Sequence, residues 1–182
     1  MDASPVIETE RLILRKPTLE DGEALLAIHT DPVAMEFIGG VHPEIRTDPE
    51  WPIRRWLARW EQNGFGPFIV ERTADGCVVG RTGFLLWDSR DWHVSSVAEA
   101  GEHAQPELGW AFVREHWGKG YATEAARAAR EWGHAQGIEG LISLIAPANV
   151  RSARLAERLG CTARETVELF DTGPAVVWEH PR

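Results

Sequence analysis

Short runs in which apolar and polar residues alternate recur along the chain, and a period of two predicts β-strands. In ERLILR, Leu12 and Leu14 fall on one face, and Ile13 with its flanking arginines falls on the other. Similar or uniformly apolar runs, bounded by turn residues, predict further strands at 67–72, 78–87, 107–113, 141–146, 162–170 and 175–180. Together these runs predict seven strands.

Between these runs, apolar residues spaced three and four apart predict amphipathic helices. Thr18 with Asp21 three residues later is typical of a helix N-terminus, so we expect a helix from Thr18 to about His29. Asp31 and Pro32 then start a short helical piece. The first predicted strand is therefore followed by helical segments.

Three longer helices have start signals of their own. Asp48 as N-cap and Pro49 at the first helical position predict a helix that ends at the glycines of NGFG. Residues 120–136 predict a helix with an alanine-rich face, which lets it lie close to a sheet. Asn149 predicts an N-cap for the last helix, which runs to about Leu159. This mixture predicts an α/β (α+β mixed) fold in which helices flank one sheet.

Length and composition narrow the class of protein further. The 182 residues fit a single domain spanning 1–182. The polar, acidic stretch 88–106 is too long for an ordinary connection, so we expect a functional or disordered loop there. No apolar run approaches the roughly 20 residues of a membrane span, and the acidic N-terminus lacks a signal-peptide pattern. These features predict a cytoplasmic protein that does not enter a membrane.

Charge and cysteine content exclude other classes. A formal net charge of -9 argues against a nucleic-acid partner, because phosphates attract lysine and arginine. It either steers a cationic substrate or only keeps the protein soluble. Cys77 and Cys161 form no CxxC pair, so we expect no metal site and two buried thiols. Nine tryptophans, an unusual number, leave open a Trp-rich surface that forms a homodimer.

The stretch HWGKGYATEA, residues 116–125, joins a strand to a helix through a glycine-rich turn. Free backbone N–H groups and the helix dipole make such a turn an anion site, although a plain structural turn has the same sequence features. The pattern lacks GxxxxGK[ST], and Thr123 stands where a dinucleotide fingerprint requires glycine. Neither a nucleotide triphosphate nor NAD is therefore favoured.

Three blocks in order carry a family resemblance: TERLILR, ELGWAFVREHWGKGYATEA and NVRSARLAERLGC. Together they resemble the GNAT acyltransferases, most closely the RimJ/RimL-like N-acetyltransferases, over residues 6–178. The resemblance implies the GNAT acyl-CoA N-acyltransferase fold, a mostly antiparallel seven-stranded sheet that splays between its fourth and fifth strands. It also implies acetyl-CoA as cosubstrate.

The same resemblance assigns cofactor contacts. The pantetheine arm would enter the splay beside the backbone of Phe112 and Val113, and Asn149 would lie beside the cofactor in addition to capping its helix. Trp117 replaces the family's usual first residue and is expected to form a wall. The pyrophosphate would bind the turn formed by Gly118, Lys119, Gly120, Tyr121, Ala122 and Thr123.

Acetyl transfer to an amine needs a base and a group that stabilises the leaving thiolate. Glu107 is the predicted base, acting through a water; the alternative is a solvated carboxylate at a strand end. The family's usual tyrosine acid is replaced by Ala156. Ser152 is the candidate to hydrogen-bond the CoA sulfur instead; the alternative is that it is only a small residue in the first turn of its helix. Rival bases lie in the preceding loop: His93, Glu99, Glu102 and His103.

The resemblance implies direct attack by a primary amine in a ternary complex, without a cysteine nucleophile. The acceptor would be a protein N-terminus or a small cationic amine. A non-catalytic module that binds or senses acyl-CoA is the alternative, because the usual acid is missing.

Overall fold

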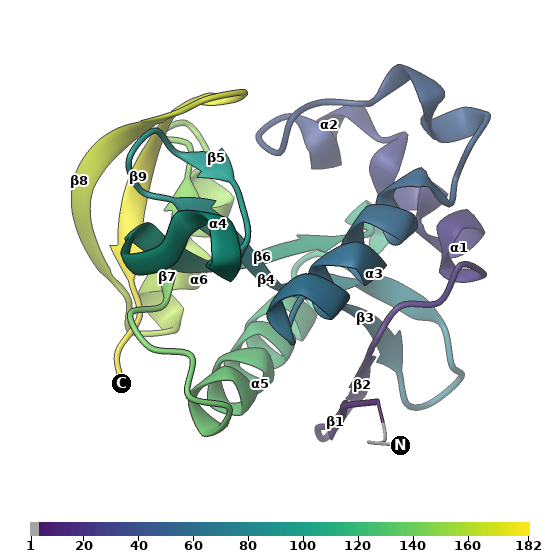
Figure 1. Ribbon diagram of the computed structural model, residues 1–182. Coiled ribbons are helices and arrows are strands. Elements are labelled where there is room, and N and C mark those ends of the chain that lie inside the picture. Colours follow the sequence, from purple (N-terminus) through teal and green to yellow (C-terminus); the bar gives the residue numbers. More distant parts are fainter. Residues whose placement is uncertain (1–3) are drawn as a thin grey trace.

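The computed structural model describes residues 4–182, and in this range one sheet of nine strands forms the centre (Figure 1). The strands are β1 (Val6–Glu8), β2 (Leu12–Arg15), β3 (Pro67–Arg72), β4 (Val78–Asp88), β5 (His93–Val94), β6 (Ala104–Phe112), β7 (Ile142–Ile145), β8 (Thr162–Leu169) and β9 (Gly173–Glu179). The helices are α1 (Asp21–His29), α2 (Pro32–Met35), α3 (Trp51–Asn63), α4 (Val97–Ala100), α5 (Tyr121–Ala135) and α6 (Val150–Arg158). Three 3-10 turns are η1 (Pro43–Arg46), η2 (Gly101–His103) and η3 (Arg114–His116).

The sheet is mixed and mostly antiparallel, as predicted. Its order is β1-β2-β3-β4-β6-β7-β9-β8, and β5 pairs with the end of β4. The one parallel neighbour pair in the described range is β6 with β7, which meet only at Glu107 and Ile142. In contrast, β4 and β6 are paired from Gly80 to Asp88. The sheet therefore opens between β6 and β7, the fourth and fifth of the strands expected from the sequence.

The seven strands predicted from the sequence are two too few, because two strands are too short to show an alternation of apolar and polar residues. β1 has only three residues, and β5 has two. β5 lies in the stretch 88–106, which the sequence favoured as a functional or disordered loop; it is instead an ordered connection with β5, α4 and η2. Its backbone finds partners on α3: Asn63 Oδ1 accepts from the Val97 amide at 3.0 Å, and Arg59 donates to the Ser95 carbonyl at 3.1 Å.

Two helices have their N-caps two residues later than predicted, at Glu20 and Glu50. α1 begins at Asp21, whose carboxylate accepts from the Thr18 amide at 2.7 Å, so Thr18 belongs to a preceding turn instead of capping the helix. α3 begins at Trp51, and the carboxylate of Asp48 is paired with Arg54 rather than with a helix amide. By contrast, Asp31 caps α2 as expected, accepting from the Val33 amide at 2.9 Å.

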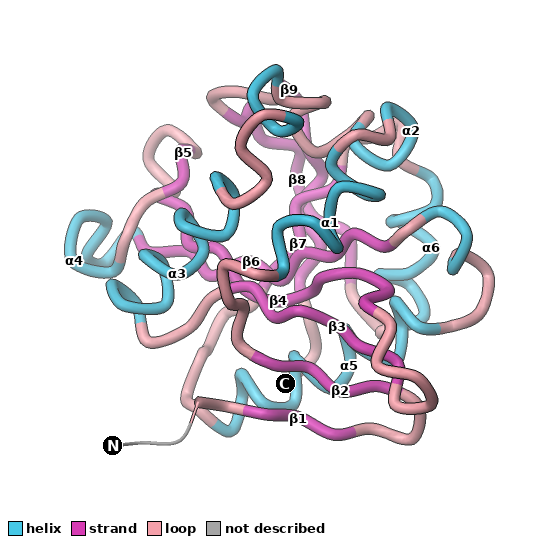
Figure 2. The backbone as a smooth tube through the Cα atoms, turned by 90° about the vertical axis from the view of Figure 1, so that its right-hand side faces the viewer, coloured by secondary structure: helices cyan, strands magenta, loops and turns pink. Residues whose placement is uncertain are grey.

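Helices cover both faces of the central strands, with α5 opposite α1 and α3 (Figure 2). The alanine face of α5 is fully buried at Ala125, Ala126 and Ala129, as the sequence predicted. Close approach also requires Gly133, because a Cβ there would lie 2.7 Å from Phe84 on β4. Small residues thus allow α5 to lie close against the sheet. In the described residues, no helix combines the length and apolarity needed to cross a bilayer.

A buried polar chain ties the sheet together where β6 and β7 begin to diverge. Ser143 Oγ on β7 donates to the Leu108 carbonyl on β6 at 2.6 Å. Its other partner is His180 Nε2 at 2.9 Å. Because the carbonyl can only accept, the serine hydrogen goes to it and His180 Nε2 donates to Ser143. Burial lowers the pKa of His180 to about 3, with Arg130 acting in the same direction, so the imidazole stays neutral in the fold.

We expect folding stability to fall as pH decreases from about 6.5 toward 3. His180 is protonated in the unfolded chain over this range but not in the fold, so the unfolded state binds more protons. The substitution H180Q keeps a hydrogen-bond donor for Ser143 and removes the titrating group. The loss of folding stability on acidification should therefore be smaller in H180Q, by up to a few kcal/mol. Urea unfolding at several pH values measures this; an unchanged pH dependence in H180Q would contradict it.

Candidate functional site

The turn between β6 and α5 presents free backbone donors. Gly118 and Gly120 have φ values of 77° and 83°, a left-handed conformation that favours glycine. In the described part of the chain, the amides of residues 118–123 have no hydrogen-bond acceptor. They lie at the N-terminus of the 15-residue helix α5, where the helix dipole is positive. The geometry is that of an anion site.

Arg11 fixes this turn from the other side. Its guanidinium donates to the Lys119 carbonyl at 3.0 Å and to Glu124 on α5 at 2.7 Å. It also lies 4.8 Å from the centre of the Tyr121 ring. The turn is therefore held in shape without a ligand. This role of Arg11 was not predicted from the sequence, although the residue belongs to the first of the three resembling blocks.

A cavity of about 370 Å³ opens beside the turn and is called the turn cavity below. Gly118, Ala122 and Trp117 form one wall, and the indole of Trp117 donates to the Phe112 carbonyl at 2.7 Å. Three arginines of α6, Arg151, Arg154 and Arg158, also line the cavity. Their charges favour an anionic ligand in a chain that is otherwise acidic.

A second cavity of about 300 Å³, the Glu107 cavity, is lined by residues of β4, β6 and β7. Glu107 and Arg81 are its charged wall residues from the central strands. The two cavities adjoin, because the same five residues line both: Phe37, Ile38, Trp110, Asn149 and Ser152. Two ligands can therefore meet at a shared wall.

Glu107 is buried, with 8% of its surface exposed, which excludes the solvated strand-end carboxylate considered above. It is the fourth residue of β6 and not the first, because the strand begins at Ala104. Burial raises its pKa, while the Trp87 indole, which donates to Oε2 at 2.6 Å, and the charge of Arg81 oppose the shift. A carboxyl with a raised pKa suits a general base that works near neutral pH.

Ser152 lies at the shared wall, in the first turn of α6. Asn149 accepts from the Ser152 amide at 3.1 Å, so the predicted helix cap is confirmed. The Trp110 indole lies 3.2 Å from Ser152 Oγ and donates to it. Since the indole can only donate, the serine hydroxyl keeps its own hydrogen for another acceptor. Ala156 is fully buried and lines neither cavity.

The comparison with known proteins decides the family. Residues 11–162 match the family described as Acetyltransferase (GNAT) domain. The chain belongs to the GNAT acetyltransferase family. It is 30% identical to YkkB of Bacillus subtilis over 98% of this chain and 97% of that protein. The GNAT assignment is thus confirmed, and with it an N-acetyltransferase.

Solved GNAT structures agree with this fold. An acetyltransferase from Agrobacterium tumefaciens str. C58 is 27% identical, with a TM-score of 0.79, over 100% of this chain and 97% of that one. The Microcin C7 self immunity acetyltransferase MccE, solved in complex with acetyl-CoA and AMP, is 14% identical. It has a TM-score of 0.72 over 96% of this chain and 94% of MccE, and this similarity shows the fold alone.

The GNAT site does not use every backbone group expected from the sequence. Val113 donates to Val79 on β4 and accepts from His116, so neither of its backbone groups is free for a cofactor. The Phe112 carbonyl is taken by Trp117. Because strand residues alternate, the backbone of Trp110 and the amide of Phe112 face the open side instead. The expectation for Val113 is therefore wrong.

The residues predicted to bind the pyrophosphate do not all line the same cavity of this acetyltransferase. Gly118 and Ala122 line the turn cavity, whereas Gly120 and Thr123 lie on the Arg11 side. The Tyr121 side chain is buried, so only its backbone amide is available. Lys119 is exposed and its Nζ lies 3.5 Å from His116. The amides of all these residues nevertheless lie at or just before the first turn of α5.

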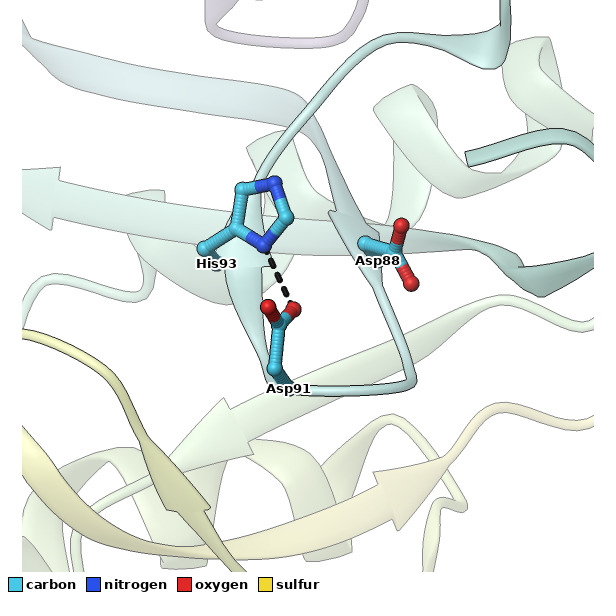
Figure 3. Close-up of side chains that lie close together, drawn as sticks. All are labelled: Asp88, Asp91 and His93. Atoms are coloured by element: carbon cyan, nitrogen blue, oxygen red, sulfur yellow. Dashed lines mark hydrogen bonds and ion pairs between the residues drawn. The ribbon is translucent and has the colours of Figure 1, made fainter. Parts of the chain in front are cut away.

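The rival bases lie outside both cavities. His93 Nδ1 is hydrogen-bonded to the Asp91 carboxylate at 2.5 Å (Figure 3). The Glu99 carboxylate accepts a hydrogen bond from the Ser96 hydroxyl at 2.9 Å. Asp88, Asp91 and His93 bring three potential ligand atoms within 4.8 Å of one another. Arg90 is already paired with Asp88 and supplies the positive charge that this carboxylate needs. We therefore interpret the cluster as an ion pair that stabilises the turn before β5.

Proposed function

We propose that the protein is an acetyl-CoA-dependent N-acetyltransferase that moves an acetyl group to a primary amine by direct attack in a ternary complex. One observation carries this proposal: two cavities, one at an anion-binding turn and one at a buried carboxylate, share a wall that contains Ser152. Such a pair of cavities allows both substrates to be bound at the same time, which direct transfer requires.

Acetyl-CoA would occupy the turn cavity. Its pyrophosphate fits the free amides of residues 118–123, and the arginines of α6 complement the remaining phosphate charge. The pantetheine arm would pair with the open backbone edge at Trp110 and Phe112, as an added strand does. MccE, a structural neighbour solved with acetyl-CoA, supports the choice of cosubstrate.

The acceptor amine would enter the Glu107 cavity. Glu107, through a water, takes a proton from the ammonium group, and the free amine then attacks the thioester carbonyl carbon. A carbon–nitrogen bond forms as the carbon–sulfur bond breaks, and the Ser152 hydroxyl donates a hydrogen bond to the leaving thiolate. The nitrogen then loses its surplus proton, and the thiolate takes up a proton, which gives the amide and the free thiol. Burial raises the pKa of Cys161 to about 11, so this thiol is protonated at neutral pH and does not compete as a nucleophile.

Substituting S152A is expected to lower kcat by about 10-fold or more, because a hydrogen bond to a developing charge is lost. The KM for acetyl-CoA should change little, since the bond strengthens mainly as the thiolate forms. S152T keeps the hydroxyl and should recover part of the rate. An S152A enzyme with wild-type kcat would show that Ser152 serves only the helix start.

The proposal is tested by release of free thiol from acetyl-CoA with a panel of amines: amino acids, polyamines, aminoglycosides and peptides with free N-termini. Turnover with any of them, and acetylated product by mass spectrometry, is the expected result. If acetyl-CoA binds but no amine gives thiol release, the alternative of a non-catalytic acyl-CoA-binding module is correct.

A further inference from the structure

We infer that the acceptor is a free amino acid or a closely similar zwitterion, whose carboxylate pairs with Arg81 while its amine lies near Glu107. This inference rests on the proposed function and names the substrate class of the same cavity. It differs from both acceptors expected from the sequence, a protein N-terminus and a purely cationic amine.

Arg81 is a partly buried cation that interacts with the charge of Glu107 but makes no close ion pair within the part of the chain that the structure describes. In the described residues 4–182, its Nε is fully buried and has no hydrogen-bond acceptor, and no carboxylate oxygen lies within 4.0 Å of the guanidinium. Its recorded aromatic neighbour is Trp56, whose ring centre is 5.4 Å away. A guanidinium in such surroundings is costly unless an anion pairs with it. It lines the Glu107 cavity, so a ligand can reach it.

Arg81 and Glu107 are spaced for a short zwitterion. They extend from neighbouring strands on the same face, with Gly109 between them. A Cβ at Gly109 would lie 3.8 Å from Glu107 Oε1 and 3.9 Å from Arg81 Nη1. These two distances put the charged groups less than about 8 Å apart, so a molecule whose amine and carboxylate are one to three carbons apart can pair with Arg81 directly and reach Glu107 through the bridging water.

Other charges near the cavity are consistent with such an acceptor. His29 is buried, and its pKa is lowered to about 4 by burial and by Arg81, so it adds no charge near neutral pH. Asp171 lies exposed among the residues that line the cavity. A purely cationic amine would leave Arg81 unpaired and be repelled by it. A peptide N-terminus has a neutral amide where the carboxylate should be.

The other residues that line the Glu107 cavity favour an acceptor amino acid with an apolar side chain. Leu85, Trp87, Val94 and Leu169 line the same cavity and provide apolar surface close to the two charges. Such a wall favours aliphatic or aromatic side chains through burial of their surface. Leucine and phenylalanine are therefore suitable first substrates.

The test compares thiol release with leucine, leucinamide and isopentylamine, and with phenylalanine, phenylalaninamide and phenethylamine. In the wild-type enzyme, kcat/KM should be at least about 10-fold higher for each acid than for its amide or amine, because only the acid pairs with Arg81. Substituting R81Q should abolish this preference. The matched control R90Q, which changes an arginine outside both cavities, should keep it.

Substituting G109A gives a second readout that does not remove any charge. The new Cβ makes only ordinary contacts at 3.8 and 3.9 Å, so the fold should be retained. It would nevertheless occupy the space between the two charged groups and raise the KM for the amino acid, with the KM for acetyl-CoA as an internal control.

The outcomes separate the inference from the function on which it rests. Turnover of amides and amines as efficient as that of the acids, with no effect of R81Q on the ratio, would overturn the inference and leave an N-acetyltransferase. Absence of thiol release with every amine would contradict the proposed function and the inference with it.

Discussion

Replacing Glu107 with glutamine is expected to lower kcat by about 10²- to 10⁴-fold, the usual effect of removing a general base. The change is nearly isosteric, and the glutamine oxygen can still accept from the Trp87 indole that now lies 2.6 Å from the carboxylate. The loss should therefore be chemical and not structural. Steady-state thiol release measures kcat, and circular dichroism confirms that the variant is folded.

The pH profile and a matched variant make this result specific. Burial raises the pKa of Glu107, so kcat/KM of the wild-type enzyme should fall on acidification at a higher pH than an ordinary glutamate would give. This limb should be absent in E107Q. E99Q changes a rival carboxylate outside both cavities and should keep the wild-type rate and limb; a loss in E99Q with none in E107Q would assign the base to the preceding connection.

Replacing Gly118 with aspartate is expected to weaken acetyl-CoA binding by about 10- to 100-fold relative to asparagine at the same position. A Cβ at Gly118 would have no neighbour within 4 Å, so either side chain fits. Asn and Asp both tolerate the left-handed backbone, and they differ only in charge. The carboxylate of G118D would repel the pyrophosphate and compete for the free amides of the turn. Isothermal titration gives both Kd values.

Salt provides the control for this pair of variants. Because the difference is electrostatic, the ratio of the two Kd values should decrease as ionic strength rises from about 0.05 to 0.5 M. Equal affinities of G118D and G118N at low salt would show that the phosphates do not bind at this turn.

Local features of the site could be predicted from the sequence. The glycine turn, the alanine face of α5 and the cap at Asn149 each depend on residues close in the chain, and the structure has all three. The opening of the sheet came from the family resemblance, and a single register pair between β6 and β7 agrees with it.

Features that depend on distant residues were missed. Arg81 and Glu107 meet only because β4 pairs with β6 in one particular register, which alternation along each strand does not fix. In the mostly apolar run VVGRTGFLLW, the single charged residue Arg81 was the feature that could have pointed to this site. The sequence also led us to expect backbone groups of Val113 that are free for a cofactor. Its amide is instead bonded to Val79, which lies 34 positions earlier and whose pairing the local sequence does not reveal.

The central claim is acetyl transfer within a ternary complex, and initial rates of thiol release test it most directly. Acetyl-CoA and the best amine of the panel are varied together, and the product is identified by mass spectrometry. Double-reciprocal lines that intersect, with the acetyl group on the amine and none on the protein, are the predicted result. Parallel lines and an acetylated enzyme intermediate would contradict the account.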